Sequence, residues 1–321
     1  MKNPFQALLK AARIARKQSL SAAHVLQQIA LSPKPTRKRA KTGAKAAKRP
    51  PGTFFDGRFS SPHGGLAYKL YTPHGWAQRQ LPLVVMLHGC TQSAADFALG
   101  TGMNEVADEL GFLALYPQQA VWANLGRCWN WHRSGDQKRG SGEPAAIAAL
   151  TRHIIATCKA NSARVYIAGI SAGGAAAAII ASAYPEIYVA VGVHSGLVHG
   201  NVSTLRGALS AMRTGADAAG KTTRPPPTII FHGDQDMVVH PSNANGFLNQ
   251  LQRSSPHPII SRTETGRSAG GRDFTRTVYR RRLGEPRLEV WTVHGSGHAW
   301  SGGSACSAVR SIIVSAAATS A

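Results

Sequence analysis

Residues 164–174 read RVYIAGISAGG and place one serine, Ser171, between two glycines. An apolar β-branched run precedes this serine and an alanine-rich run follows it, so the pattern predicts a tight turn from a strand into a helix. In such a turn the residue at the tip has a strained backbone and its side chain projects away from the sheet. Gly169 and Gly173 leave room where a Cβ would collide with the neighbouring strand or helix. Ser171 is therefore the predicted nucleophile.

A serine nucleophile needs two partners. Its hydroxyl reacts weakly at neutral pH, so an imidazole must accept the proton and a carboxylate must orient the imidazole. In chains with this turn the acid follows the serine and the histidine comes last. The stretch FHGDQDMVVHP offers Asp234 and Asp236 as the acid. Asp236 is favoured because it lies further into the loop, where it can reach a histidine, and Asp234 is interpreted as a turn or cap residue.

The stretch VHGSGHAW offers His294 and His298 as the base. His298 is favoured because it lies in a glycine-rich loop after the last predicted strand, where its side chain can project toward the edge of the sheet. His294 ends that strand. His88, His194 and His232 lie near predicted strand ends or turns, and we interpret them as structural or substrate-facing residues rather than general bases.

Stabilising a tetrahedral intermediate requires two amide donors that face the oxyanion. Ala172 supplies the first, because it follows the nucleophile at the start of the predicted helix. The second is expected from the turn HGCTQ, where the backbone N–H of Cys90 is the best candidate. The Gln92 side chain is a further candidate for substrate contact, with a solvated loop glutamine as the alternative. The chemistry indicated is acyl transfer to water, which needs no metal and no cofactor.

The elements that would position these residues are short apolar runs alternating with helical stretches. Near-continuous apolar runs that end in Gly or Pro are typical of strands buried on both faces. The segment 143–160 has Pro near a first helical turn and apolar residues at helical spacing, and a second helix is expected directly after Ser171. This alternation predicts an α/β fold with a mostly parallel sheet covered by helices. The five predicted core strands are 81–89, 111–117, 164–169, 188–196 and 227–233, and RTVYRR and RLEVWTVHG are expected to complete the sheet.

The N-terminal segment differs in composition from the rest of the chain. The chain has 321 residues and a formal net charge of +22, and residues 1–55 carry 13 Lys or Arg with no Asp or Glu. Residues 1–53 are predicted to form a basic amphipathic helix followed by a Pro- and Lys-rich linker. Polycations of this kind bind phosphate backbones whatever their sequence, so residues 1–50 are candidates for contact with nucleic acid, an anionic surface or a polymer granule. A solubilising or surface-tethering tail is the favoured interpretation.

Cations at positions 10, 13, 16 and 17 interrupt the first 20 residues, so no standard export signal is visible. No stretch reaches the roughly 20 apolar residues that a transmembrane helix needs. The four cysteines match no zinc-binding spacing, and four cysteines allow three pairings.

Several segments, in the same order, resemble the poly(3-hydroxybutyrate) depolymerase family of esterases, which are related to feruloyl and acetylxylan esterases within the α/β-hydrolase superfamily. The resemblance runs from about Phe54 to Ser304. It rests on LHGCTQSAADFALGTGMNEVADELGFLALYPQQ, CWNWH, RGSGEPAAIAALTRHI, RVYIAGISAGGAAAA, YVAVGVHSGL, FHGDQDMVVHP and GHAWSGGSA. It implies an α/β-hydrolase catalytic domain over residues 54–321, a doubly wound sheet with helices on both faces, and no cofactor.

Carried over by position, the resemblance assigns the nucleophile to Ser171, the acid to Asp236 and the base to His298. It implies that the HGC turn forms the oxyanion loop and that the CWNW loop lines the substrate cleft. Indole rings suit an apolar polyester or an aromatic acyl group, with core packing as the alternative. The aromatic candidates for substrate contact are Trp129, Trp131 and Trp300. The resemblance also suggests a disulfide between Cys90 and Cys128, which would favour an oxidising compartment.

The resemblance implies a serine esterase that hydrolyses poly- or oligo(3-hydroxyalkanoate) esters. It also implies a location outside the cell, with a cytoplasmic or granule-associated location as the alternative. A feruloyl or acetylxylan esterase is the enzymatic alternative. A protein that coats polymer granules or anionic surfaces through the basic arm is the non-enzymatic one. Two features depart from the family pattern: the arm stands where secreted members carry a signal peptide, and the chain after Ser304 reads ACSAVRSIIVSAAATSA.

Overall fold

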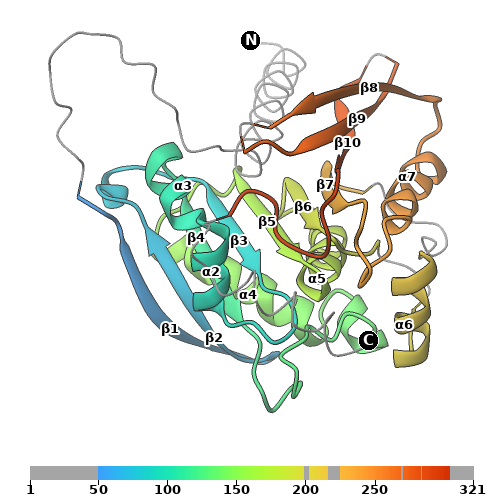
Figure 1. Ribbon diagram of the computed structural model, residues 1–321. Coiled ribbons are helices and arrows are strands. Elements are labelled where there is room, and N and C mark those ends of the chain that lie inside the picture. Colours follow the sequence, from blue (N-terminus) through green and yellow to red (C-terminus); the bar gives the residue numbers. More distant parts are fainter. Residues whose placement is uncertain (1–49, 199–201, 216–224, 269, 283, 304–321) are drawn as a thin grey trace, which may run out of the picture.

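The fold is organised around one ten-stranded sheet with the order β1-β2-β4-β3-β5-β6-β7-β10-β9-β8 (Figure 1). The computed structural model describes residues 50–303 except 199–201, 216–224, 269 and 283. The predicted arm at residues 1–49 and the divergent segment 304–321 lie outside the described residues.

The centre of the sheet is parallel. Each neighbouring pair in the order β4-β3-β5-β6-β7-β10 runs in the same direction. These strands are mostly apolar, and β3, β5 and β6 are buried throughout. The predicted parallel core is therefore confirmed. Its strands are β3 (Leu83–Leu87), β4 (Leu113–Gln118), β5 (Val165–Ile170), β6 (Ala190–His194), β7 (Thr228–Gly233) and β10 (Pro286–Val293).

Helices cover both faces of this sheet, as expected for a doubly wound fold (Figure 1). One buried apolar cluster joins the sheet to α4, α5, α6 and α7, and a second cluster joins the opposite face to α2 and α3. The helix predicted over 143–160 is found as α4, and the alanine-rich run after Ser171 forms α5. The bounds are α2 (Ala94–Thr101), α3 (Met103–Leu110), α4 (Gly142–Thr157), α5 (Ala172–Ala183), α6 (Leu205–Thr214) and α7 (Asn243–Arg253), with 3-10 turns at Trp76–Gln78 and Ser134–Gln137.

Antiparallel strands extend the sheet at both ends. The hairpin of β1 (Thr53–Ser61) and β2 (Gly64–Thr72) joins through β2 to β4, and β9 (Asp273–Arg281) joins β10 to β8 (Ile259–Arg267). Strands β1 and β8 are mostly exposed. The apolar runs that identified the central strands are absent from them, so the sequence predicted neither strand.

The parallel strands all end at the same edge of the sheet, so the loops that follow β3, β4, β5, β6, β7 and β10 gather there. This edge is where α/β sheets bind their ligands. All of the predicted site residues lie in these loops or directly beside them. Among the described residues, no helix has the length and hydropathy needed to cross a membrane.

Candidate active site

Ser171 occupies the predicted strained turn between β5 and α5. Its backbone has φ 56° and ψ −123°, outside the regions that L-residues normally adopt. The flanking glycines are required by close packing: a Cβ on Gly169 would overlap the backbone of Gly173, and one on Gly173 would overlap the carbonyl oxygens of Leu87 and His88. The prediction that neither position tolerates a side chain is confirmed.

The same packing brings the start of α5 against the turn after β3. The first intrahelical bond runs from the Ala175 N–H to the Ser171 carbonyl at 3.0 Å, so the preceding amides have no partner within the helix. A Cβ on Gly89 would lie 3.3 Å from the Ile170 side chain, beside Ser171. The two loops that carry Ala172 and Cys90 are thus in contact, as an oxyanion site built from both would require.

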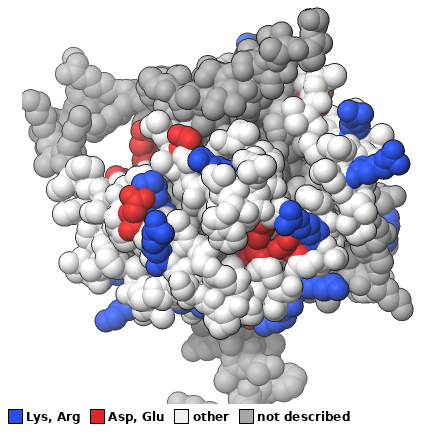
Figure 2. Space-filling model, turned by 90° about the horizontal axis from the view of Figure 1, so that it is seen from below, with Lys and Arg blue, Asp and Glu red and all other residues white. Residues whose placement is uncertain are grey.

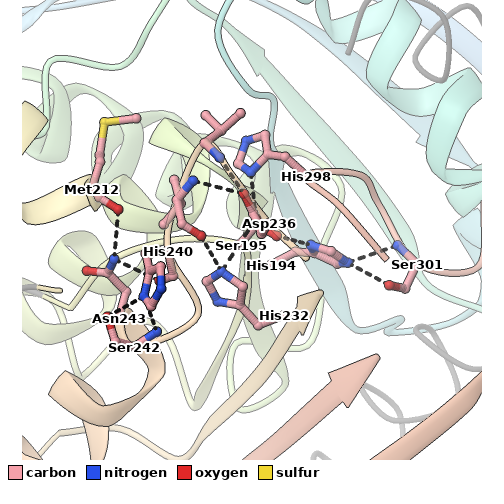
Figure 3. A network of polar contacts seen from close by, with 12 residues as sticks. His194, Ser195, Met212, His232, Asp236, His240, Ser242, Asn243, His298 and Ser301 are labelled. Atoms are coloured by element: carbon pink, nitrogen blue, oxygen red, sulfur yellow. Dashed lines mark hydrogen bonds and ion pairs between the residues drawn. The ribbon is translucent and has the colours of Figure 1, made fainter. Parts of the chain in front are cut away.

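Asp236 and His298 form a buried hydrogen bond across 62 residues of chain (Figure 3). The His298 Nδ1–H donates to Asp236 Oδ2 at 2.8 Å, which leaves Nε2 free to accept a proton. The other carboxylate oxygen accepts from the backbone N–H groups of Val238 and Val239 at 3.0 and 2.9 Å. Burial alone would raise the pKa of Asp236, but hydrogen bonds from His232 and His298 hold it well below its usual value. The carboxylate therefore stays ionised.

The two remaining candidates pair with each other. The His294 Nδ1–H donates to Asp234 Oδ2 at 2.8 Å, and the Gly295 N–H donates to Oδ1 at 2.8 Å. The second ring nitrogen of His294 lies 2.9 Å from the Thr275 hydroxyl on β9. Both side chains of this pair are partly exposed, whereas those of Asp236 and His298 are buried. The pair ties the ends of β7, β9 and β10 together, which suits the interpretation of Asp234 as a turn residue.

His194 at the end of β6 links the two halves of the candidate site. Sequence reasoning interpreted this residue as structural or substrate-facing and did not identify the link. Its carbonyl accepts the Ser171 N–H at 2.9 Å, and its Nε2 accepts the Ser301 N–H at 2.9 Å, three residues beyond His298 (Figure 3). The ring stacks on Trp300 with centroids 5.1 Å apart. Burial, followed by the neighbouring His232 and His298, lowers the pKa of His194 to about 3. The ring is therefore neutral, with its proton on Nδ1.

A disulfide joins Cys90 to Cys128 and thereby ties the HGC turn to the CWNW loop. The Thr91 N–H also donates to the Gly126 carbonyl at 2.6 Å. Gln92 is buried, and its Oε1 accepts the Gly89 N–H at 2.8 Å. The alternative of a solvated Gln92 is therefore wrong. Its carbonyl oxygen braces the turn.

For the tryptophans, the sequence left substrate contact and core packing as alternatives, and the structure favours packing for Trp129. Trp129 is 0% exposed, and its Nε1–H donates to the His88 carbonyl at 3.1 Å, so its ring does not line an open cleft. Trp131 is also buried. Trp300 is half-buried between His194 and Phe97. These indoles fill space between loops, because a large ring beside a parallel sheet gains more from burial than from exposure.

A partly buried carboxylate that sequence reasoning did not identify supports the CWNW loop. Glu143 at the start of α4 accepts hydrogen bonds from the Asn130 N–H at 2.8 Å, the Asn130 Nδ2 at 2.6 Å and the Gln119 Nε2 at 2.5 Å. Burial, then the charge of Asp136, raises the pKa of Glu143 to about 7 against these bonds. The short motif RGSGEP supplies this residue, but only the fold shows what it contacts.

Comparisons with known proteins identify the family. The family model for esterase PHB depolymerase matches residues 66–276. Poly(3-hydroxyalkanoate) depolymerase C from Paucimonas lemoignei is 31% identical over 253 residues, which cover 75% of this chain and 60% of that protein. Feruloyl esterase B from Neurospora crassa is 30% identical over 190 residues, covering 52% of this chain and 63% of that one. The chain thus spans about 60% of the length of these relatives.

Solved structures support the fold. An acetyl xylan esterase from Aspergillus awamori superposes with a TM-score of 0.61 at 20% identity, covering 77% of this chain and 94% of that one. A ferulic acid esterase superposes with a TM-score of 0.51 at 14% identity, covering 78% and 93%. The sheet order, the serine turn between β5 and α5 and the matches in sequence lead to one assignment. The chain belongs to the esterase PHB depolymerase family, with an α/β-hydrolase fold.

Proposed function

We propose that the protein is a serine esterase that uses Ser171, His298 and Asp236 as a catalytic triad. The observation that carries the proposal is the buried 2.8 Å bond between Asp236 and His298, in a loop that the Ser301–His194 bond ties to the end of β6 beside Ser171. The carboxylate fixes the tautomer in which His298 Nε2 can accept the serine proton. The family assignment supports the same reaction class.

The reaction would proceed in two acyl-transfer steps. The Ser171 Oγ attacks the ester carbonyl carbon while His298 Nε2 takes its proton, and the oxyanion receives hydrogen bonds from the amides of Cys90 and Ala172. His298 then protonates the departing alcohol, which leaves an acyl-serine. Water, deprotonated by His298, attacks the acyl carbon, and collapse of the second oxyanion releases the carboxylic acid and restores Ser171.

The proposed substrates are poly- or oligo(3-hydroxyalkanoate) esters, on the basis of the relative named poly(3-hydroxyalkanoate) depolymerase C. Feruloyl or acetyl esters of polysaccharide form a second candidate class, favoured by the relatives named feruloyl esterase B and acetylxylan esterase A. Release of 3-hydroxybutyrate from amorphous polymer, compared with release of ferulate or acetate from xylan, separates the two. An extracellular location is also proposed, since a disulfide beside the site suits an oxidising compartment.

Substitution of Ser171 by Ala tests the proposal. Loss of the nucleophile is expected to lower kcat for p-nitrophenyl butyrate by about 10³-fold or more, with an unchanged circular dichroism spectrum. The two Asp–His pairs offer a matched control. Asp236→Asn is expected to lower kcat by about 10²-fold or more, and Asp234→Asn by less than about fivefold. An active Ser171→Ala variant, or equal losses in the two Asp variants, would refute the assignment.

A further inference from the structure

The loop between β4 and the disulfide exposes large apolar side chains to solvent. We call residues 119–126, QAVWANLG, the rim loop; they include no charged residue. Trp122 is 82% exposed and Leu125 is 90% exposed, and Val121 is exposed as well. Single exposed apolar residues are ordinary, but three within five positions of one loop are a local concentration of exposed apolar side chains, as interaction surfaces have.

The exposure is a property of a firmly held loop. The N–H groups of Ala123 and Asn124 donate to the Ala120 carbonyl at 3.1 and 3.2 Å. The Asn124 side chain accepts from the Gly126 N–H at 3.0 Å and donates to Asn130 at 3.1 Å. The loop therefore has a defined shape that holds Trp122 and Leu125 away from the core. Collapse of these side chains onto the protein would require these bonds to break.

The rim loop lies next to the candidate active site. Its last residue, Gly126, accepts the Thr91 N–H, and the disulfide from Cys128 to Cys90 follows directly. It follows β4, so it lies at the edge of the sheet where β5, β7 and β10 end and the loops after them begin. In Figure 1 it is part of the green loop that extends lowest. Figure 2 views this side from below and shows wide uncharged areas between separate clusters of charged side chains.

A second exposed apolar pair lies beside the proposed acid. Met237 is 94% exposed and Val238 is exposed too, directly after the buried Asp236. The Val238 N–H is held by the Asp236 carboxylate, so the position of this pair is coupled to the site. Loops after two different strands thus present apolar side chains at the edge that carries Ser171.

The absence of charge among the exposed side chains of the rim loop indicates which kind of surface it can bind. A polyanion would be recognised by Lys and Arg, which the chain has in abundance at 37 positions but not in the rim loop. Apolar side chains without charge gain free energy only by leaving water against an apolar surface. We propose that the rim loop, together with Met237 and Val238, docks the protein onto the surface of an uncharged, water-insoluble polyester. This docking role rests on the proposed esterase function, because it places the ester groups of such a surface beside Ser171.

Adsorption measured without catalysis tests the proposal. The full chain carrying Ser171→Ala is mixed with washed amorphous poly(3-hydroxybutyrate) particles, and the protein left in the supernatant gives the binding constant. Adding Trp122→Ser and Leu125→Ser is expected to weaken adsorption about tenfold or more. Adsorption of the parent should persist in about 1 M NaCl, where charge attraction is screened to a few ångströms.

Leu110→Ser provides the matched control. Leu110 is an exposed leucine that ends α3 just before β4 begins, so it lies toward the opposite edge of the sheet. Its substitution should leave adsorption unchanged. Equal weakening by Leu110→Ser, or adsorption that disappears in 1 M NaCl, overturns the proposal. So does a rim-loop variant that adsorbs like its parent while sedimentation shows that a dimer of the parent has become a monomer, because the loop would then bind a second copy.

The result also separates this proposal from the esterase assignment. If the wild-type chain hydrolyses no p-nitrophenyl ester but the rim-loop substitutions still abolish adsorption, the catalytic proposal fails and the docking surface stands. If hydrolysis is normal and the substitutions leave both adsorption and polymer degradation unchanged, the docking surface fails and the esterase assignment stands.

Discussion

At the scale of single residues, the site was predictable where sterics or chemical order fix the choice. The two glycines around Ser171 identify the turn because a Cβ at either position meets backbone. Asp236 and His298 followed from their order and from their places after strands. His194 could not be found in this way, because its importance comes from two hydrogen bonds to residues 23 and 107 positions away along the chain. Such contacts exist only after folding.

The role of His194 can be tested with side chains that place a hydrogen-bond acceptor for the Ser301 N–H at different distances from the backbone. Gln presents an amide oxygen at about the distance of Nε2 from the backbone and can still accept the Ser301 N–H, whereas Asn is too short. His194→Gln is expected to keep kcat for a soluble ester within about fivefold. His194→Asn is expected to lower kcat by about 10- to 100-fold at nearly constant KM, because a displacement of His298 by about 1 Å lowers the rate by up to about 100-fold. Steady-state kinetics provides both constants.

Ser301→Ala is the control for this pair. It removes the hydroxyl, which lies 3.0 Å from His194 Nε2, and keeps the backbone N–H that donates to the same nitrogen at 2.9 Å. It should resemble the wild type. If His194→Asn and His194→Gln lose kcat equally, the ring has a packing role only. A spectroscopic readout supports the kinetics: the deshielded proton between His298 and Asp236 should be visible by NMR in the Gln variant and broadened in the Asn variant.

At the scale of elements, the central strands were predictable and their covering loops were not. Short apolar runs identify β3 to β7, whereas β1 and β8 alternate weakly and lie exposed at the ends of the sheet. The burial of Trp129 and the exposure of Trp122 show most clearly that the sequence does not predict which loop side chains are buried. Both are tryptophans in the same loop region, but Trp129 belongs to the buried cluster that includes α4, whereas Trp122 lies outside it.

Two of the central strands end in buried neutral histidines, which predicts a pH dependence of stability. Burial lowers the pKa of His88, which follows β3, to about 4 and that of His194 to about 3. Both values lie below the unfolded value of about 6.5. The unfolded chain therefore binds more protons, so the stabilisation present above pH 6.5 is lost as the pH falls toward 4, by about 2.7 kcal/mol per pH unit from these two groups.

The total slope between pH 7 and pH 4.5 also contains Glu143, whose pKa is raised to about 7 and whose contribution therefore has the opposite sign. Urea unfolding of the wild type and a His194 variant over this range isolates the histidine contribution as a difference in slope. His194→Gln removes one of the two groups and keeps the acceptor for Ser301, so it should reduce the slope by about one proton, which is 1.4 kcal/mol per pH unit. An unchanged slope in that variant would mean that His194 titrates in the folded protein as it does in the unfolded chain.

At the scale of the whole molecule, unbalanced positive charge is concentrated in one part of the chain and the proposed catalytic residues lie in another. All 13 cations of the first 55 residues precede β1, and the described loops around Ser171 follow it. We therefore propose that residues 54–321 form the catalytic domain and that the basic arm acts separately, as a tether to an anionic surface. The structure begins its first strand at Thr53, next to the boundary expected from composition.

A chain that starts at Gly52 tests this division. Without the arm it should keep kcat/KM for p-nitrophenyl butyrate within about twofold, since the proposed catalytic residues lie in loops after β3, β5, β7 and β10. Binding to anionic phospholipid vesicles should fall at least about tenfold at low salt, because counterion release and charge attraction depend on the removed cations. Adsorption to polyester particles should be retained, because that role is assigned to Trp122 and Leu125. Loss of ester hydrolysis in the shortened chain would instead show that the arm is part of the catalytic fold, and unchanged vesicle binding would assign anion binding to arginines elsewhere in the protein.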